Sequence, residues 1–195
     1  RGRSGGSRKR LSGFSPSRSE DEDSKDSKPA REKKPPTPER LEQRARNVLL
    51  HQLARSAKST QQLRKILENR EIPSEIAERV LERFTEVGLI DDQAYAETIV
   101  NSRRNFKGLS KSAIKRELNE KGVPSAYIET AIESITAEDD FEAAKQLAAR
   151  RIRQMSSLTR EVRERRLAGY LGRKGYPSSV VFAAIKFAES QIEPV

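Results

Sequence analysis

The residues of this sequence with the clearest chemical capability are arginines and lysines that gather in its second half. Guanidinium and ammonium groups bind phosphate, so such clusters are candidate contacts for nucleic acid or for a protein that carries it. A solvated helix face is the competing interpretation for most of them. The candidate contact set is Arg103, Arg104, Lys107, Lys111, Lys115, Arg116, Arg150, Arg151, Arg153, Arg163, Arg165, Arg166, Arg173 and Lys174.

Arg103 stands apart from the rest of this set. Tyr95 and Ile99 lie four residues apart on one helical stripe, and Arg103 extends that stripe by one more turn. A charge at the edge of an apolar face usually has a specific partner, because burying it unpaired is costly. We therefore expect Arg103 to be paired.

Residues that could support catalysis are few. His51 is the one histidine, and its place beside an apolar stripe is typical of a partly buried structural residue. The pairs Asp91-Asp92 and Asp139-Asp140 could ligate a metal, but both open expected helices, where carboxylates favour the positive end of the helix dipole. The sequence has no glycine-rich phosphate loop, GxSxG or HExxH motif. We predict no enzymatic activity, no metal and no cofactor.

The charge is unevenly distributed along the chain. The formal net charge of +10 favours polyanionic partners. Residues 1–38 carry 11 basic and 6 acidic side chains, so half of the positive excess lies in about a fifth of the sequence. The mildly basic remainder fits a protein that meets nucleic acid partly through another protein.

The composition also indicates in which compartment the protein is expected to occur. No stretch approaches the roughly 18 apolar residues of a membrane span, and the N-terminal stretch has no apolar core of a secretory signal. There is no cysteine, which excludes disulfides and thiolate metal sites. We expect a cytoplasmic protein without a membrane partner.

Residues 1–38 have the composition of a disordered tail. Leu11 and Phe14 are their only sizeable hydrophobic side chains, so they cannot bury enough apolar area to offset the entropy of ordering. A solvated linker is the simpler interpretation, and a basic arm that makes loose phosphate contacts is the alternative.

From Glu39 onward the apolar residues recur every three or four positions, which indicates amphipathic helices. Val48, Leu49, Leu53 and Ala57 form the first such stripe, and no stretch alternates as a strand would. The sequence therefore predicts an all-α fold.

Three prolines reveal an internal repeat. Pro73, Pro124 and Pro177 are spaced by 51 and 53 residues. The flanking positions match between copies, which indicates one supersecondary unit used three times. The matching sets are Leu63, Ile114 and Leu167 ten before the proline, Leu67, Leu118 and Leu171 six before, Ile76, Tyr127 and Val180 three after, and Leu81, Ile132 and Ile185 eight after.

Local structure explains the residue types found at the repeated positions. The apolar sets should face the core, and the proline suits the first turn of a helix, where its missing N–H costs nothing. Gly122 and Gly175, two before their prolines, suit a left-handed residue that ends a helix. Glu71 stands at this position in the first copy, so that helix is expected to end differently.

Helix starts can be assigned from capping residues. Ser59 and Ser110 each stand 14 before their proline and suit an N-cap, and Ser59 with Gln62 can form a capping box. Asp91 and Thr136 are plausible caps of the helices that open the second and third units. The corresponding helix of the third unit is expected to begin near Ser157 or Thr159, with first helices over about 39–56, 92–106 and 138–155.

These signals predict three tandem three-helix repeats in an extended, arched modular arrangement, preceded by a disordered N-terminal tail. The expected segments are 1–38 for the tail, then 39–90, 91–137 and 138–195 for the repeats. Because each unit is small, neighbours should share apolar surface or be only marginally stable alone.

One segment resembles a known family. Gly88-Leu89-Ile90-Asp91-Asp92, Tyr95-Ala96 and Lys121-Gly122-Val123 are similar to the central signature of the RecX family of recombinase regulators. Further matching positions are Val100, Arg103, Gly108, Ile114 and Leu118. The similarity is strongest over 88–124, extends more weakly over about 40–190, and excludes residues 1–38.

The resemblance implies a regulator of the RecA recombinase. Such proteins bind the RecA filament on single-stranded DNA, lie along its groove, and inhibit ATP hydrolysis, strand exchange and co-protease activity. We expect a monomer whose basic residues meet RecA or the DNA within the filament. Capping of a growing filament end and binding along the groove both remain open.

A second hypothesis is a protein of helix-turn-helix type that binds DNA directly. The third helices speak against it, because their exposed faces carry carboxylates that would repel phosphate. These acidic residues are Glu75, Glu78, Glu82 and Glu86 in the first copy, and Glu129 and Glu133 in the second.

Overall fold

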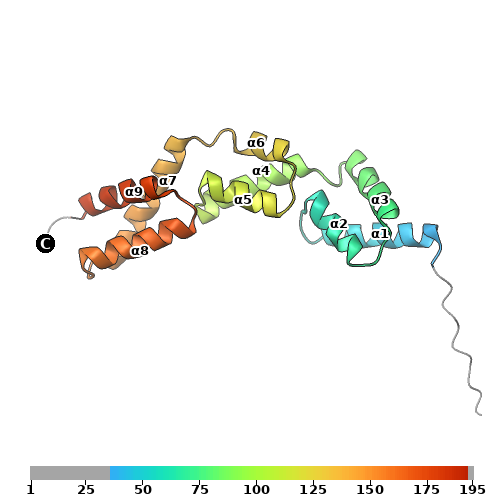
Figure 1. Ribbon diagram of the computed structural model, residues 1–195, viewed down its shortest axis with the longest axis horizontal. Coiled ribbons are helices and arrows are strands. Elements are labelled where there is room, and N and C mark those ends of the chain that lie inside the picture. Colours follow the sequence, from blue (N-terminus) through green and yellow to red (C-terminus); the bar gives the residue numbers. More distant parts are fainter. Residues whose placement is uncertain (1–35, 193–195) are drawn as a thin grey trace, which may run out of the picture. The chain divides into compact units, whose positions relative to one another are not determined.

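The computed structural model describes residues 36–192, which form helices joined by short turns, with no strand among them. The helices occur in three consecutive groups (Figure 1). Repeat 1 contains α1 (Pro38–Leu53), α2 (Thr60–Glu68) and α3 (Ser74–Glu86); repeat 2 contains α4 (Asp92–Ser102), α5 (Lys111–Glu120) and α6 (Ser125–Ile132); repeat 3 contains α7 (Ala137–Ile152), α8 (Arg160–Arg173) and α9 (Ser178–Ser190). The all-α fold and its three three-helix repeats are confirmed.

The tail hypothesis falls outside the described residues, apart from its last three positions. Thr37 caps α1 by accepting a hydrogen bond from the backbone N–H of Arg40, and Pro38 is the first helical residue. None of the described helices is both long enough and apolar enough to cross a membrane.

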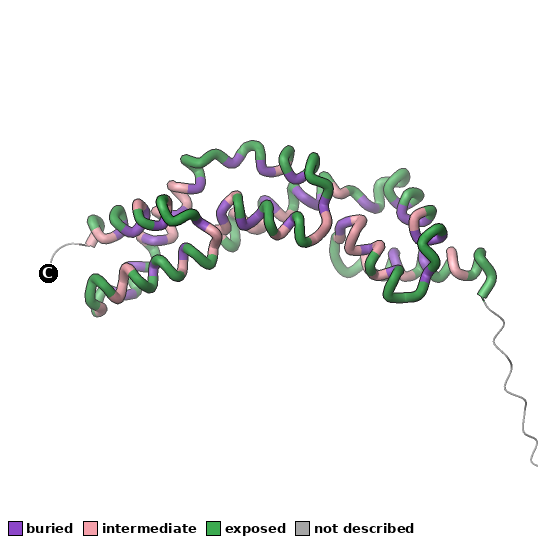
Figure 2. The backbone as a smooth tube through the Cα atoms, viewed as in Figure 1, coloured by how far each residue is buried: buried purple, intermediate pink, exposed green. Residues whose placement is uncertain are grey.

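Each repeat has a hydrophobic core of its own. The three clusters of buried side chains run over 45–90, 95–135 and 144–188, and none of them mixes residues from two repeats. Figure 2 shows the buried positions recurring along the helices between exposed ones. In the described residues, therefore, neighbouring repeats do not share a core, and their junctions must rely on other contacts.

The repeated apolar positions behave largely as predicted. All six side chains ten and six residues before the prolines are fully buried. Eight residues after the proline, Leu81, Ile132 and Ile185 are buried as well. The position three after is not uniform: Ile76 is buried, Val180 is half-buried, and Tyr127 is 41% exposed. The prediction for Tyr127 was wrong because this position of α6 faces the neighbouring repeat rather than the core.

The predicted caps are confirmed. Ser59 and Gln62 form a capping box at α2, and Ser110 accepts a hydrogen bond from the Ala113 N–H at α5. Asp91 and Thr136 cap α4 and α7. Thr159 is the N-cap of α8, without a side-chain hydrogen bond to the helix. The three prolines are themselves N-caps and stand one residue before the first helical turn, where a missing N–H is equally harmless.

Glu71 corrects another prediction. Its backbone has a φ of +58°, so it adopts the left-handed conformation that Gly122 and Gly175 adopt at +70° and +84°. The N–H of Ile72 then donates to the carbonyl of Leu67, as in the other two copies. The first copy therefore ends its helix in the same way, at the cost of about 1 kcal/mol that a side chain adds in this conformation. Since Glu71 can adopt this conformation, the turn alone does not explain why Gly122 and Gly175 are glycines.

Two expectations for α1 were wrong. The helix ends at Leu53 and not near residue 56, so Ala57 lies beyond it and is exposed. His51 is also exposed, because it lies in the last turn on the side away from the buried Leu49.

The end of α4 contains an irregular turn. Residues Arg103–Lys107 form a π-helical segment, η1, which closes at Gly108 in the left-handed conformation. A π turn holds one more residue than an α turn, and such turns occur frequently at functional sites. The expected first helix over 92–106 is therefore α4 followed by η1.

Candidate functional site

A buried serine makes the same pair of hydrogen bonds at both contacts between repeats, which we call junction 1–2 and junction 2–3. Ser59 and Ser110 each cap their own second helix and also donate their hydroxyl to a backbone carbonyl of the following repeat. The acceptors are the carbonyls of Lys121 and Gly175, the latter at 2.7 Å from Ser110 Oγ. Both serines are fully buried, so one hydroxyl serves an N-cap and a junction at once.

Each pair of aspartates is divided between two helices. Asp91 accepts the N–H of Ala94 as the cap of α4, and Asp139 accepts the N–H of Thr136 as the second half of the capping box of α7. Asp92 accepts the N–H of Thr60 at 2.8 Å, and Asp140 accepts the N–H of Lys111 at 3.1 Å. The second aspartate therefore binds the first N–H of the preceding repeat's second helix, where the helix dipole favours a carboxylate. All four aspartates therefore bind the N-terminal end of a helix. Asp91 and Asp139 do so within their own repeat, and Asp92 and Asp140 do so on the preceding repeat.

The close approach at the junctions explains Gly122 and Gly175. A Cβ on Gly122 would lie 2.6 Å from Gln61 Cβ, and one on Gly175 would lie 2.5 Å from Ala113 Cβ. Glu71, in contrast, is exposed, so no packed neighbour among residues 36–192 restricts it. The glycine is required by the packed junction more than by the turn itself.

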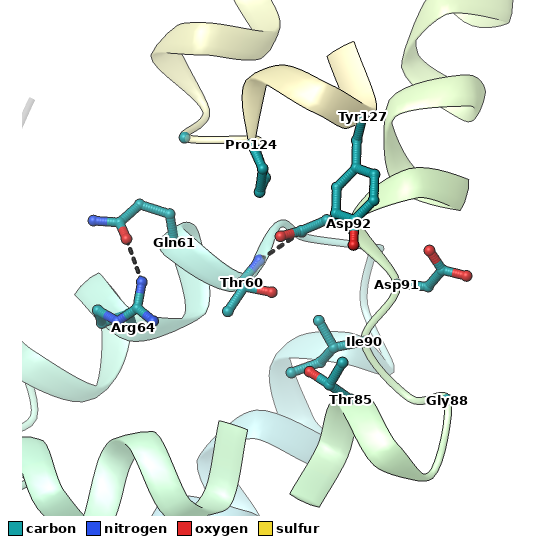
Figure 3. Close-up of a pocket in the computed structure, with 11 residues that line it drawn as sticks. Thr60, Gln61, Arg64, Thr85, Gly88, Ile90, Asp91, Asp92, Pro124 and Tyr127 are labelled. Carbon is teal, nitrogen blue, oxygen red and sulfur yellow. Dashed lines mark hydrogen bonds between the residues drawn. The ribbon is translucent and has the colours of Figure 1, made fainter. Parts of the chain in front are cut away.

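Junction 1–2 also holds an open pocket of about 560 Å³. Figure 3 shows Tyr127 and Pro124 of repeat 2 across from Thr60 and Gln61 of repeat 1, with Asp92 bonded to the Thr60 N–H. Sequence reasoning missed the exposed Tyr127, and no local signal distinguishes it from the buried Ile76 of repeat 1.

Six of the fourteen candidate basic residues are engaged within the fold. Arg103 donates from Nε and its terminal nitrogen to Glu117 of α5 at 2.6–2.9 Å, which confirms that it has a specific partner. These bonds lower the pKa of Glu117. Arg163 makes the same forked contact with Glu189 of α9. Such pairs join helices of one repeat, so these cations are already neutralised.

Two other candidates bridge junction 2–3, and two more are engaged inside repeat 2. Arg104 pairs with Asp140 across the junction, whereas Lys111 Nζ donates to the carbonyl of Ile135 just after α6. Lys174 donates to the carbonyl of Lys107, and its partial burial there lowers its pKa. Lys115 pairs with Glu129 inside repeat 2.

The remaining candidates are open to a partner. Arg151 donates to Gln154, and its guanidinium lies 5.8 Å from the ring centre of Tyr170. The others are exposed and have no acidic partner among residues 36–192: Lys107, Arg116, Arg150, Arg153, Arg165, Arg166 and Arg173. Five of these seven lie in repeat 3, and three are on α8.

The third helices of repeats 1 and 2 carry exposed carboxylates. Glu75, Glu82 and Glu86 are exposed on α3, beside the exposed Arg79 and Arg83, and Glu129 on α6 and Glu133 at its C-cap are exposed too. Glu78 is half-buried and bonded to Arg64. The exposed charge is therefore mixed with a small acidic excess on α3, whereas basic residues outnumber acidic ones on α8. No group of three or more histidine, cysteine or acidic side chains within the described part could hold a metal ion.

Comparison with known proteins gives a consistent result. Three family models, described as the first, second and third three-helix domains of RecX, match residues 45–84, 91–132 and 138–185. "Regulatory protein RecX" of Streptomyces coelicolor is 43% identical over 157 residues, which cover 80% of this chain and 83% of that protein. The protein of the same name from Thermobifida fusca is 38% identical over 149 residues, with 76% and 80% covered.

Two solved structures have a similar fold. The crystal structure of RecX from Lactobacillus salivarius matches with a TM-score of 0.65 at 19% identity, over 77% of this chain and 97% of that one. A crystal structure of regulatory protein RecX matches with a TM-score of 0.63 at 26% identity, over 79% and 74%.

Proposed function

Because this chain belongs to the RecX family, we propose that it is a regulator of the RecA recombinase that acts by occupying the RecA filament on single-stranded DNA. The observation that carries the proposal is the match of all three repeats, in order, to the three RecX domains. In this proposal the bound protein inhibits ATP hydrolysis, strand exchange and co-protease activity without chemistry of its own, as a cytoplasmic monomer.

The charge distribution supports a composite partner. A binder of DNA alone would gain from cations on every exposed face, whereas α3 exposes three glutamates against two arginines. The free arginines of α8 can contact phosphate, and the mixed charges of α3 can meet a charged protein surface. Two weak contacts in one complex reinforce each other, because the second forms at a high effective concentration.

We expect the full chain to bind a RecA filament on single-stranded DNA at least about tenfold more tightly than the same DNA without RecA. The measurement is anisotropy of a labelled oligonucleotide at one fixed salt concentration, with RecA held on the DNA by a nonhydrolysable ATP analogue. Duplex DNA without RecA is the comparison for the competing helix-turn-helix hypothesis. Equal or tighter binding to duplex would contradict the proposal and favour direct DNA recognition.

A further inference from the structure

Phe106 is exposed to a degree that packing does not explain. Its side chain is 88% exposed, the highest value among the large apolar side chains of the described residues. Burial of a phenylalanine ring is among the larger gains a side chain offers to folding, so a ring left in water is informative. It lies in η1, the π-helical turn at the end of α4.

The turn that carries Phe106 is held on both sides. Arg103 is fixed to Glu117 of α5, and Arg104 is fixed to Asp140 of α7. The turn closes at Gly108, where a Cβ would lie only 3.0 Å from Leu147 of α7. The ring is therefore presented from a restrained backbone, which lowers the entropy lost when a partner binds it.

The neighbourhood of the ring is cationic and aromatic. Lys107 follows it directly and is exposed, and the carbonyl of Lys107 accepts a hydrogen bond from Lys174. Lys174 Nζ lies 5.1 Å from the ring centre of Tyr170, whose other cation is Arg151. The two carboxylates that η1 contacts, Glu117 and Asp140, are already bound by arginines. Asp139 and Glu142, which line a pocket with Arg104, are engaged by Thr136 and Lys145. The exposed charge directly next to Phe106 in the chain is the cation of Lys107.

We propose that Phe106 is a base-stacking residue for single-stranded nucleic acid, with Lys107 contacting an adjacent phosphate. An exposed ring among cations is the arrangement that binds unpaired bases without sequence preference, since every base has a stacking face. A double helix hides its bases, so the ring would add nothing to duplex binding. This inference rests on the proposed function and assigns the DNA contact within it.

The test uses three variants of the full chain and a labelled oligothymidylate. Phe106→Ala is expected to weaken binding about tenfold, the usual effect of losing one stacked base. Phe182→Ala is the matched control, because that ring is 73% exposed on α9, where Lys186 is the one basic residue, and its loss should leave affinity unchanged. Since the chain has no tryptophan, Phe106→Trp introduces a single tryptophan, whose emission a stacked base should quench.

The outcomes separate this inference from the proposed function. Equal affinity of Phe106→Ala and the unaltered chain, unquenched Phe106→Trp emission, or no binding to the oligonucleotide at all would each overturn the stacking site, even if the filament is still bound. If Phe106→Ala loses the RecA filament but keeps the naked oligonucleotide, the ring contacts protein and the inference is wrong. Failure of the unaltered chain to bind the filament would count against the proposed function alone.

Discussion

Replacing Gly175 by alanine is expected to separate repeat 3 from repeat 2. The new methyl group would lie 2.5 Å from Ala113 Cβ and 2.8 Å from Ser110 Oγ, and neither of these atoms is the end of a flexible side chain. The left-handed backbone costs an alanine about 1 kcal/mol, and forced overpacking costs a further 1–3 kcal/mol or so. Moving the two repeats apart to relieve the overlap would stretch the hydrogen bonds that Ser110 and Ser112 donate to the Gly175 carbonyl.

Gly88→Ala is the matched control for this prediction. Gly88 has a φ of +71°, but a Cβ there meets nothing within 4 Å, so its variant bears the backbone cost alone. Nitrogen-15 relaxation of the two variants should show repeat 3 tumbling independently in Gly175→Ala only, and urea unfolding should show the larger loss there. Equal loss of stability in both variants, with unchanged tumbling, would mean that the junction does not depend on close approach.

Replacing Asp140 by alanine is the second change with a large expected effect. Its carboxylate is 13% exposed, pairs with Arg104, and accepts the backbone N–H of Lys111. Removing one partner of a buried pair costs about 3–5 kcal/mol, because the other charge stays behind without compensation. We expect about 3 kcal/mol, the lower end, since Arg104 keeps 18% exposure and can reach water.

Asp92→Ala provides the comparison at the equivalent position of junction 1–2. Asp92 accepts the Thr60 N–H but has no arginine partner within the described residues, so its loss should cost only about 1 kcal/mol. The free energy of unfolding of both variants, measured in urea at low salt, gives the difference. A loss for Asp140→Ala no greater than that for Asp92→Ala would show that the Arg104 pair contributes nothing to the junction.

The repeat and its helix ends could be predicted from sequence because their signals are local. Ser59 with Gln62, Asp91, and Gly122 before Pro124 each act on a turn within four residues. The buried stripe of Leu63 and Leu67 lies on one helix and needs no knowledge of its neighbours. Such features follow from capping and periodicity alone.

The features that sequence reasoning missed depend on distant residues. Asp140 binds Lys111, 29 positions earlier in the chain, and Tyr127 lines a pocket together with Thr60 and Gln61 of repeat 1. Glu71 adopts the same left-handed turn as the two glycines and is exposed there, without the close contacts that a Cβ at Gly122 or Gly175 would meet. Pairing also separates basic residues that sequence reasoning treated alike: Arg163 pairs with Glu189, 26 positions later, whereas Arg166 is exposed and has no acidic partner among residues 36–192.

The rate of ATP hydrolysis by RecA on single-stranded DNA is the most direct test of the proposed regulator. The full chain is titrated into preformed filaments at fixed DNA, ATP and salt concentrations, because phosphate contacts weaken as salt rises. Binding along a filament predicts that protein well below one copy per RecA already slows hydrolysis. An unchanged rate at equimolar protein and RecA would contradict the proposed function.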